Sequence, residues 1–316
     1  MTIADGGGVT FAQTATFSGD IDLAGSIDVD GTTNLDVVDV DGAANFAADV
    51  TFADGADIIT ASAGTSNFRA GVNAGNSIES GGNYNVLVGD EAGTALTTGD
   101  NNVALGYKAL FTEDTGNRSV AIGDFSLQNQ NNADSNYNTA VGYAAGAAVT
   151  TGVQNTLIGG LAGDAITTGN YNVGVGYTSL SANTTGVSNI AIGNFALSAN
   201  TTASNNTAVG QSALLANTTG AENTAVGALA GDALTVGANV VAVGYKALTS
   251  DTKGFGSVAI GNQALENQNF TSNTDTFNTA VGYFAGNDIT TGIRNTLIGG
   301  LAGDDLTDAD YNTAVG

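Results

Sequence analysis

The sequence of 316 residues contains no cysteine, no histidine, no proline and no tryptophan. Without cysteine the chain has no disulfide framework and no thiolate chemistry. Without histidine it lacks the usual general base near neutral pH and the commonest metal ligand. Ser–His–Asp catalysis, Cys–His catalysis and histidine-based zinc sites are therefore excluded.

Positive charge is also scarce, with six lysines and arginines against 30 acidic residues and a net charge of −24. Phosphate neutralisation needs clustered Lys and Arg, so we expect no nucleic-acid partner. The same charge argues against attraction to anionic membranes. No apolar run approaches the ~20 residues of a membrane helix, so we expect no membrane insertion. Strong acidity favours a soluble, well-separated molecule.

Residues 1–65 are rich in acid and in alternating apolar residues. Eleven aspartates lie between Asp5 and Asp57, and no Lys or Arg precedes Arg69. Apolar residues alternate in pairs such as Ile21 with Leu23, which is typical of half-buried strands. We predict an acidic, strand-rich shaft or attachment segment here, in which partner chains bury the apolar face. Residues 66–82 are predicted as a junction with a degenerate first coil.

From residue 83 a five-residue phrase such as Asn138-Thr-Ala-Val-Gly142 recurs along the chain. Its closing glycines are Gly89, Gly106, Gly123, Gly142, Gly159, Gly176, Gly193, Gly210, Gly227, Gly244, Gly261, Gly282, Gly299 and Gly316. Neighbouring glycines differ by 17 residues, except for 19 into Gly142 and 21 into Gly282. A fixed short period predicts a solenoid. Because Gly316 lies inside a repeat phrase, we expect the natural chain to continue beyond it.

Each repeat has a fixed pattern around its closing glycine. The residue before the glycine is Val, Ile or Leu, the one before that is usually Ala, and the third is Val, Ile or Thr. This pattern predicts a short strand with one β-branched face and one small face. A second segment, often ending in Thr-Thr-Gly, follows. We therefore predict two short strands and two turns in each coil.

The second segment holds a strict exchange between two positions. Where the fourth residue after the glycine is Gly, the seventh is apolar, as in Gly163 with Ile166; where the fourth is Leu, the seventh is polar, as in Leu197 with Asn200. All thirteen complete coils obey this rule. If side chains from both positions filled the same space in the core, or if neither did, the overpacking or the cavity would destabilise the fold by about 1–3 kcal/mol or more. Both positions are therefore predicted to point into the same core.

A longer repeat is also present. Residues 107–110 return at 245–248, and residues 155–164 return at 295–304, offsets of 138 and 140 residues. A block of about eight coils is thus duplicated. Both copies contain a long coil, at residues 128–136 and 266–276, and the extra residues are predicted to bulge outward.

The phrases Ser119-Val-Ala-Ile-Gly123 and Ser257-Val-Ala-Ile-Gly261 resemble the head repeat of trimeric autotransporter adhesins. In that family the repeats form a left-handed parallel β-roll with three chains side by side. Asn-Thr-Ala-Val-Gly phrases with Thr-Thr-Gly turns are similar to those of bacteriophage tail-fibre proteins, and the Val-Asp-Val-Asp-Gly texture near residues 28–31 and 39–42 resembles phage fibre shafts. The coil here is longer than the usual adhesin unit, and no secretion signal or anchor is visible, which favours a phage fibre.

Several residues invite a site interpretation. Asp28 with Asp30, and Asp39 with Asp41, resemble the start of a calcium loop but lack its closing glutamate. Asp304 with Asp305, or Asp308 with Asp310, would need a cleft to cleave glycans. The threonine pairs are adjacent, whereas an ice-binding array needs alternate threonines on one flat strand. We predict no catalytic residue, no cofactor and no metal site.

Two other rows have open interpretations. The recurring asparagines, four residues before the glycine, could contact a ligand, but we predict a hydrogen-bonded ladder between coils. Tyrosines that follow the glycine could stack on sugars or pack against a neighbouring chain. They are Tyr107, Tyr143, Tyr177, Tyr245 and Tyr283.

The sequence therefore predicts an all-β fold: a parallel β-solenoid or β-roll of about fourteen 17-residue repeats over residues 83–316, forming a homotrimer. The predicted function is that of a phage tail fibre in the virion, which projects and positions host-receptor binding and is not an enzyme. Its expected partners are tail or baseplate proteins at the N-terminal end and a host surface glycan or protein receptor. The alternatives are a trimeric adhesin on a bacterial cell surface and, more distantly, a polysaccharide-cleaving tailspike.

Overall fold

The computed structural model describes residues 62–133 and 135–316. The chain divides into a unit over Met1–Asp57 and a second unit over Ile58–Gly316. The shaft predicted for residues 1–65 and its calcium-like aspartates lie almost wholly outside the described residues. The described residues, 62–133 and 135–316, form strands, turns and bends, and none of them is in a helix.

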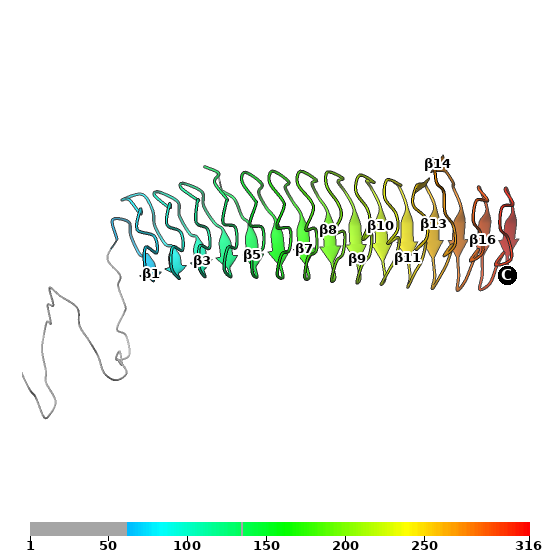
Figure 1. The fold of residues 1–316 in the computed structure, drawn as a ribbon, viewed down its shortest axis with the longest axis horizontal. Coiled ribbons are helices and arrows are strands. Elements are labelled where there is room, and N and C mark those ends of the chain that lie inside the picture. Colours follow the sequence, from blue (N-terminus) through cyan, green and yellow to red (C-terminus); the bar gives the residue numbers. More distant parts are fainter. Residues whose placement is uncertain (1–61, 134) are drawn as a thin grey trace, which may run out of the picture. The chain divides into compact units, whose positions relative to one another are not determined.

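The second unit is built on one parallel sheet of fifteen short strands (Figure 1). These strands are β1 (Phe68–Ala70), β2 (Val86–Val88), β3 (Val103–Leu105), β4 (Val120–Ile122), β5 (Thr139–Val141), β6 (Thr156–Ile158), β7 (Val173–Val175), β8 (Ile190–Ile192), β9 (Thr207–Val209), β10 (Thr224–Val226), β11 (Val241–Val243), β13 (Val258–Ile260), β15 (Thr279–Val281), β16 (Thr296–Ile298) and β17 (Thr313–Val315). Each pairs in parallel with the equivalent strand one coil on, as Ala225 pairs with Ala242. The fold is therefore a parallel β-solenoid of 17-residue coils, as predicted, and at about 4.8 Å per strand the sheet is roughly 67 Å long.

The prediction of two strands in each coil is wrong. Apart from two two-residue strands beside the second long coil, only the residues directly before the closing glycine form a strand, and the segment after the glycine is a succession of turns. Its residues two and four positions after the glycine have left-handed backbone angles, as at Phe195 (φ 58°) and Leu197 (φ 51°). Coils still bond to one another there, since the Leu197 amide donates to the Ala213 carbonyl at 2.9 Å. An extended strand cannot include such angles.

The closing glycines are required by the stacking of the coils. Gly210 has a φ of 136°, and a Cβ atom placed there would lie 2.5 Å from the carbonyl oxygen of Gly227 in the next coil. Any side chain would therefore both strain the backbone and push the two coils apart. This explains why the glycine recurs in every repeat.

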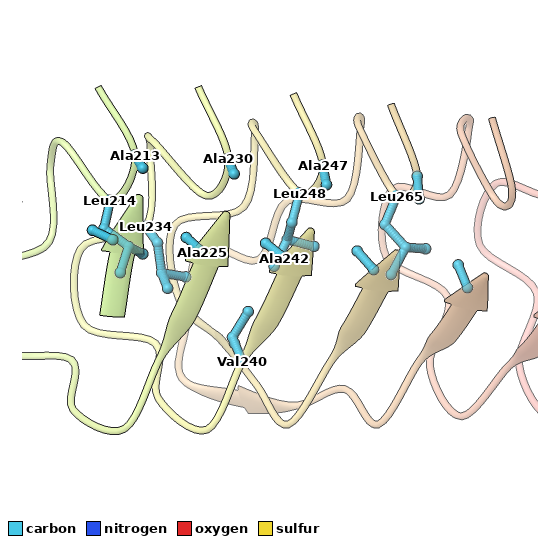
Figure 2. Packing of buried hydrophobic residues seen from close by; sticks show 14 of the residues in the cluster. Ala213, Leu214, Ala225, Ala230, Leu234, Val240, Ala242, Ala247, Leu248 and Leu265 are labelled. Carbon is cyan, nitrogen blue, oxygen red and sulfur yellow. The ribbon is translucent and has the colours of Figure 1, made fainter. Parts of the chain in front are cut away.

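The small residue at the centre of each strand faces the core. Ala225 and Ala242 are fully buried and pack against Ala213, Ala230 and Leu214 from the turn segment (Figure 2). The core is thus a thin layer in which alanine from the sheet meets alanine and leucine from the facing wall. The larger β-branched residues on either side of each central residue face outward, because successive strand residues alternate.

The Gly–Leu exchange works as predicted. Leu197 and Asn200 are fully buried in one type of coil, and Ile166 is fully buried in the other. In the second type, a Cβ at Gly163 would lie 2.7 Å from Leu157 Cδ2 and 2.8 Å from Ile166 Cδ1. The glycine therefore makes room for two neighbours, one from the strand and one from the following turn.

The asparagine ladder is also confirmed. Asn189 Oδ1 accepts a hydrogen bond from the Asn206 amide at 3.0 Å, and its Nδ2 donates to the Ala203 carbonyl at 2.9 Å. Each buried asparagine thus joins two coils and a turn. The ladder changes where serine or valine replaces asparagine, at Ser119, Val240 and Ser257.

The extra residues of the two long coils form small additions beside the stack. In the first, Asn117 and Ser135 form an isolated parallel bridge. In the second, β12 (Gly254–Phe255) pairs with β14 (Thr274–Asp275), which stands beside the main sheet in Figure 1. The main sheet keeps its register through both long coils.

Candidate functional site

The most extensive surface feature of the solenoid is the outward side of its sheet. We call the first and third residues of the fifteen strands the outer face. The third residues are aliphatic in all fifteen strands, and the first residues are Val, Ile, Thr or, in β1, Phe68. In a single chain, large aliphatic residues of the outer face are exposed to solvent; Ile158 and Ile192 each have 40% of their surface accessible.

The outer face also carries no charge. None of its thirty residues is Asp, Glu, Lys or Arg, although the chain has 36 such residues. Charged residues on a surface keep a protein soluble, so a continuous uncharged aliphatic stripe is unexpected on the solvent-exposed surface of an acidic chain. Large exposed apolar surfaces of this kind mark sites of association.

One border of the outer face is formed by the residues that follow the closing glycines, which we call the trailing row. It includes the five predicted tyrosines, whose side chains are 38–59% exposed. Three of these rings pack edge to face on phenylalanines of adjacent coils: Tyr107 on Phe125 with centroids 5.3 Å apart, Tyr143 on Phe125 at 5.9 Å, and Tyr177 on Phe195 at 5.8 Å. The phenylalanines hold these tyrosines in place without covering them.

The other border is formed by residues five positions before the closing glycines, which we call the leading row. Its members are Tyr84, Asn101, Arg118, Tyr137, Gln154, Tyr171, Ser188, Asn205, Glu222, Asn239, Gly256, Phe277, Arg294 and Tyr311. All have φ between 47° and 73°, and all except the half-buried Gly256 are exposed. The row cannot be recognised from the sequence alone, because its residue types differ and only the backbone conformation is shared.

Bulky side chains in the leading row occupy an unfavourable backbone position. Left-handed angles are adopted readily by Gly, Asn and Asp, and rarely by bulky residues. Arg294 lies over the rings of Phe277 and Tyr311, 5.9 and 5.5 Å from their centroids, and donates to the Tyr311 hydroxyl at 2.7 Å. The row thus gathers aromatic and cationic groups at the edge of an apolar stripe.

Two buried carboxylates lie inside the solenoid, next to the long coils. Glu113 accepts hydrogen bonds from the Gly116 amide (2.8 Å), Gln130 Nε2 (2.7 Å) and Asn136 Nδ2 (2.9 Å). In the duplicated block Asp251 accepts from Gln268 Nε2 (2.6 Å) and from the Gly254 amide (3.0 Å). Burial raises the pKa of both carboxyl groups, and these hydrogen bonds oppose the rise. Each carboxylate holds part of a long coil in place.

The aspartates considered for glycan cleavage lie in the turns of the last coil. Asp310 Oδ1 accepts a hydrogen bond from the Ile293 amide at 2.8 Å, and Asp308 accepts from Thr307 Oγ1 at 3.3 Å. The first contact joins two successive coils, and the second lies within one turn. Among residues 62–133 and 135–316, no group of three or more acidic residues is arranged to hold a metal ion, and none of their segments is a helix that could span a bilayer.

Comparison with protein-family models, with characterised proteins and with solved structures finds no match to this chain. The outer face and its two border rows therefore have to be interpreted from their own chemistry.

Proposed function

We propose that this chain is the body of an extracellular fibre, in which parallel copies associate through the outer face. The observation that carries the proposal is the uncharged aliphatic stripe along the whole sheet of a chain with a net charge of −24. The fibre is that of a phage virion, and its task is to project and position host-receptor binding. The number of copies is three, on the resemblance of the Ser-Val-Ala-Ile-Gly phrases to adhesin β-rolls.

The dimensions of the stripe suit stable association. A face about 67 Å long and, with its border rows, about 15–20 Å wide offers roughly 1,000–1,300 Å² per copy, compared with about 800 Å² per partner in a standard interface. Burying aliphatic surface contributes about 25 cal/mol per Å². The remaining acidic groups would face solvent and limit association to this one side.

The same surface fits a trimeric adhesin on a bacterial cell. The phage fibre and the bacterial adhesin are both self-associating rods. They differ in the structure to which the end of the rod is attached. The tailspike alternative requires an acid pair in a cleft, whereas Asp310 accepts a hydrogen bond from the Ile293 amide of the preceding coil and Asp308 accepts one from the adjacent Thr307.

Light scattering on residues 1–316 tests the proposal, because each chain has a mass of 31.1 kDa. We expect the mass of three chains in native buffer. A stable mass of one chain at micromolar concentration would refute self-association and leave a single-chain solenoid. A mass of two chains would keep the interface and refute the trimer.

A further inference from the structure

We propose that the leading row of one copy packs against the trailing row of the next copy at the same coil, so that the two rows set the register of the assembly. The inference rests on the proposed self-association and identifies its contact residues. The partner is a second copy of this chain.

The two rows cannot meet within one chain. They border opposite sides of the outer face and are separated by six residues of mostly extended backbone, or roughly 15–20 Å. When equal copies turn their outer faces toward a common axis, the leading border of each copy meets the trailing border of its neighbour. Parallel copies without an axial shift then bring residues of the same coil together.

The residues at the two borders of a coil match in chemistry. In three coils both are aromatic: Tyr137 with Tyr143, Tyr171 with Tyr177, and Phe277 with Tyr283. Aromatic pairs contribute about 0.5–1.5 kcal/mol beyond the area that they bury. A shift by one coil would place Tyr171 opposite Gly160 or Asn194 and separate this pair.

Charge and size match as well. The coil that closes at Gly123 has Arg118 in its leading row and Asp124 in its trailing row, and no coil has like charges in both rows. The long side chains of Gln154 and Arg294 are paired with Gly160 and Gly300, which leave space for them. Copies in register therefore meet without charge repulsion.

The backbone gives a separate argument. Tyr137, Tyr171 and Phe277 have φ values of 50°, 60° and 47° and are more than half exposed in the isolated chain. An asparagine or glycine would be less strained at these positions. Strained, exposed aromatic residues are expected where a contact outside the chain compensates for them.

Thiol crosslinking tests the register, since the chain has no cysteine of its own. We would prepare the matched variant Y171C/Y177C and two variants offset by two coils, Y171C/Y143C and Y171C/Q211C. All would be treated in the native state with a short bis-maleimide and resolved under denaturing conditions. The matched pair is expected to give covalent trimers, and the offset pairs, about 10 Å further apart along the rod, are expected to stay as single chains.

The outcomes separate the two proposals. A light-scattering mass of one chain for the unmodified protein overturns both. The single variant Y171C, which has no thiol at the opposite border, is prepared as well and should not crosslink. If the assembled protein crosslinks only through an offset pair, in Y171C alone, or through no pair, the register is overturned while self-association stands.

A charge exchange gives a second measurement that does not depend on crosslinking. R118D and D124R are each expected to lower the melting temperature of the assembly in low salt, and R118D/D124R is expected to recover most of the loss. Arg118 also lies over the Tyr137 ring, 5.7 Å from its centroid. Losses that simply add in the double variant would show that only contacts within the chain had been removed, and would overturn the pairing.

Discussion

Leucine occupies a left-handed backbone position in seven coils. The φ values lie between 45° and 54° at Leu110, Leu127, Leu180, Leu197, Leu214, Leu248 and Leu265. This conformation costs about 1–2 kcal/mol for an L-residue, whereas full burial of a leucine contributes about 1.5–3 kcal/mol. Burial and the hydrogen bonds between coils therefore outweigh the strain. The same balance explains why either Gly or Leu can occupy this position without a change of backbone.

The strand contributes a third member to the Gly–Leu exchange. Leucine replaces alanine at the centre of a strand only in coils with the glycine, as with Leu87, Leu157 and Leu297. We expect Gly163→Leu to destabilise the protein by about 1–3 kcal/mol or more, because its side chain would overlap Leu157 and Ile166. The measurement is the shift of the denaturant midpoint.

The matched control converts the whole coil. L157A/G163L/I166N reproduces the pattern of Ala191, Leu197 and Asn200, and the amide introduced by I166N would lie beside Asn183 in the next coil, as Asn183 lies beside Asn200. We expect this triple variant to recover most of the stability lost by Gly163→Leu. A triple variant less stable than the single one would contradict the shared-hole interpretation.

The asparagine ladder predicts a comparable loss of stability when one asparagine side chain is removed. Asn189→Ala leaves the Asn206 backbone amide without its side-chain partner inside the core, whereas the Ala203 carbonyl keeps a hydrogen bond from Asn200 Nδ2 at 3.0 Å. A buried unpaired polar group costs about 1–3 kcal/mol, so we expect the free energy of unfolding to fall by about 1–3 kcal/mol. Exchange of the Asn206 amide hydrogen should accelerate by the same mechanism. Asn205→Gly, in the exposed leading row of the next coil, is the control and should change stability little, because glycine also adopts the left-handed angle of this position (φ 63°).

At the scale of the element, the long coils depend on their buried carboxylates. Because burial raises the pKa of Glu113 above 4.5, the native state binds its proton at a higher pH than the unfolded chain does. Stability is therefore gained as pH falls through the folded pKa and lost as pH rises through it. The slope in that window is at most about 1.4 kcal/mol per pH unit for one group.

Glu113→Gln removes this titration. The difference in unfolding free energy between the native protein and the variant should grow in favour of the native protein as pH falls from neutral toward 4.5, and urea titrations at several pH values would measure it. Glu222→Gln removes the same charge from the exposed leading row and is the control. A pH-independent difference for Glu113→Gln would show that the buried carboxyl is not protonated in the native state.

The features of the coil that could be predicted from sequence are those in which every repeat meets the same structural requirement with the same residue type. Closing glycines such as Gly210, the Gly–Leu exchange and the asparagine ladder all have one physical solution, and each was predicted. Which side of the strand faces the core could not be predicted, because both the alanine side and the valine side of a strand can pack in a core. The choice depends on the thickness of the core, which is set by the leucines of the facing turn segment. The turn segment was predicted as a strand because phenylalanine and leucine, the residue types at Phe195 and Leu197, seldom adopt left-handed angles. The leading row could not be predicted, because its residue types differ from coil to coil and only the left-handed backbone conformation is shared.

At the scale of the whole molecule, the outer face runs the length of the main sheet without a charged residue, so charge placed on it should act on assembly and not on the coil. We expect I158D/I192D/V226D to remain folded, because these side chains are 38–40% exposed, and to dissociate into single chains. Three aspartates in each buried face would lose most of their hydration without a cation to compensate. Light scattering reports the mass, and circular dichroism reports the β-structure.

T151D/T185D/T219D is the matched control, because it adds three negative charges with the same two-coil spacing at exposed turn positions. Its mass should equal that of the unmodified protein. If both triple variants dissociated, general repulsion in an already acidic chain would be the cause, and the outer face would have no special role. If I158D/I192D/V226D kept the assembled mass, the copies would have to meet through another surface. Dissociation of that variant alone would assign the interface to the one stripe from which this acidic chain excludes charge.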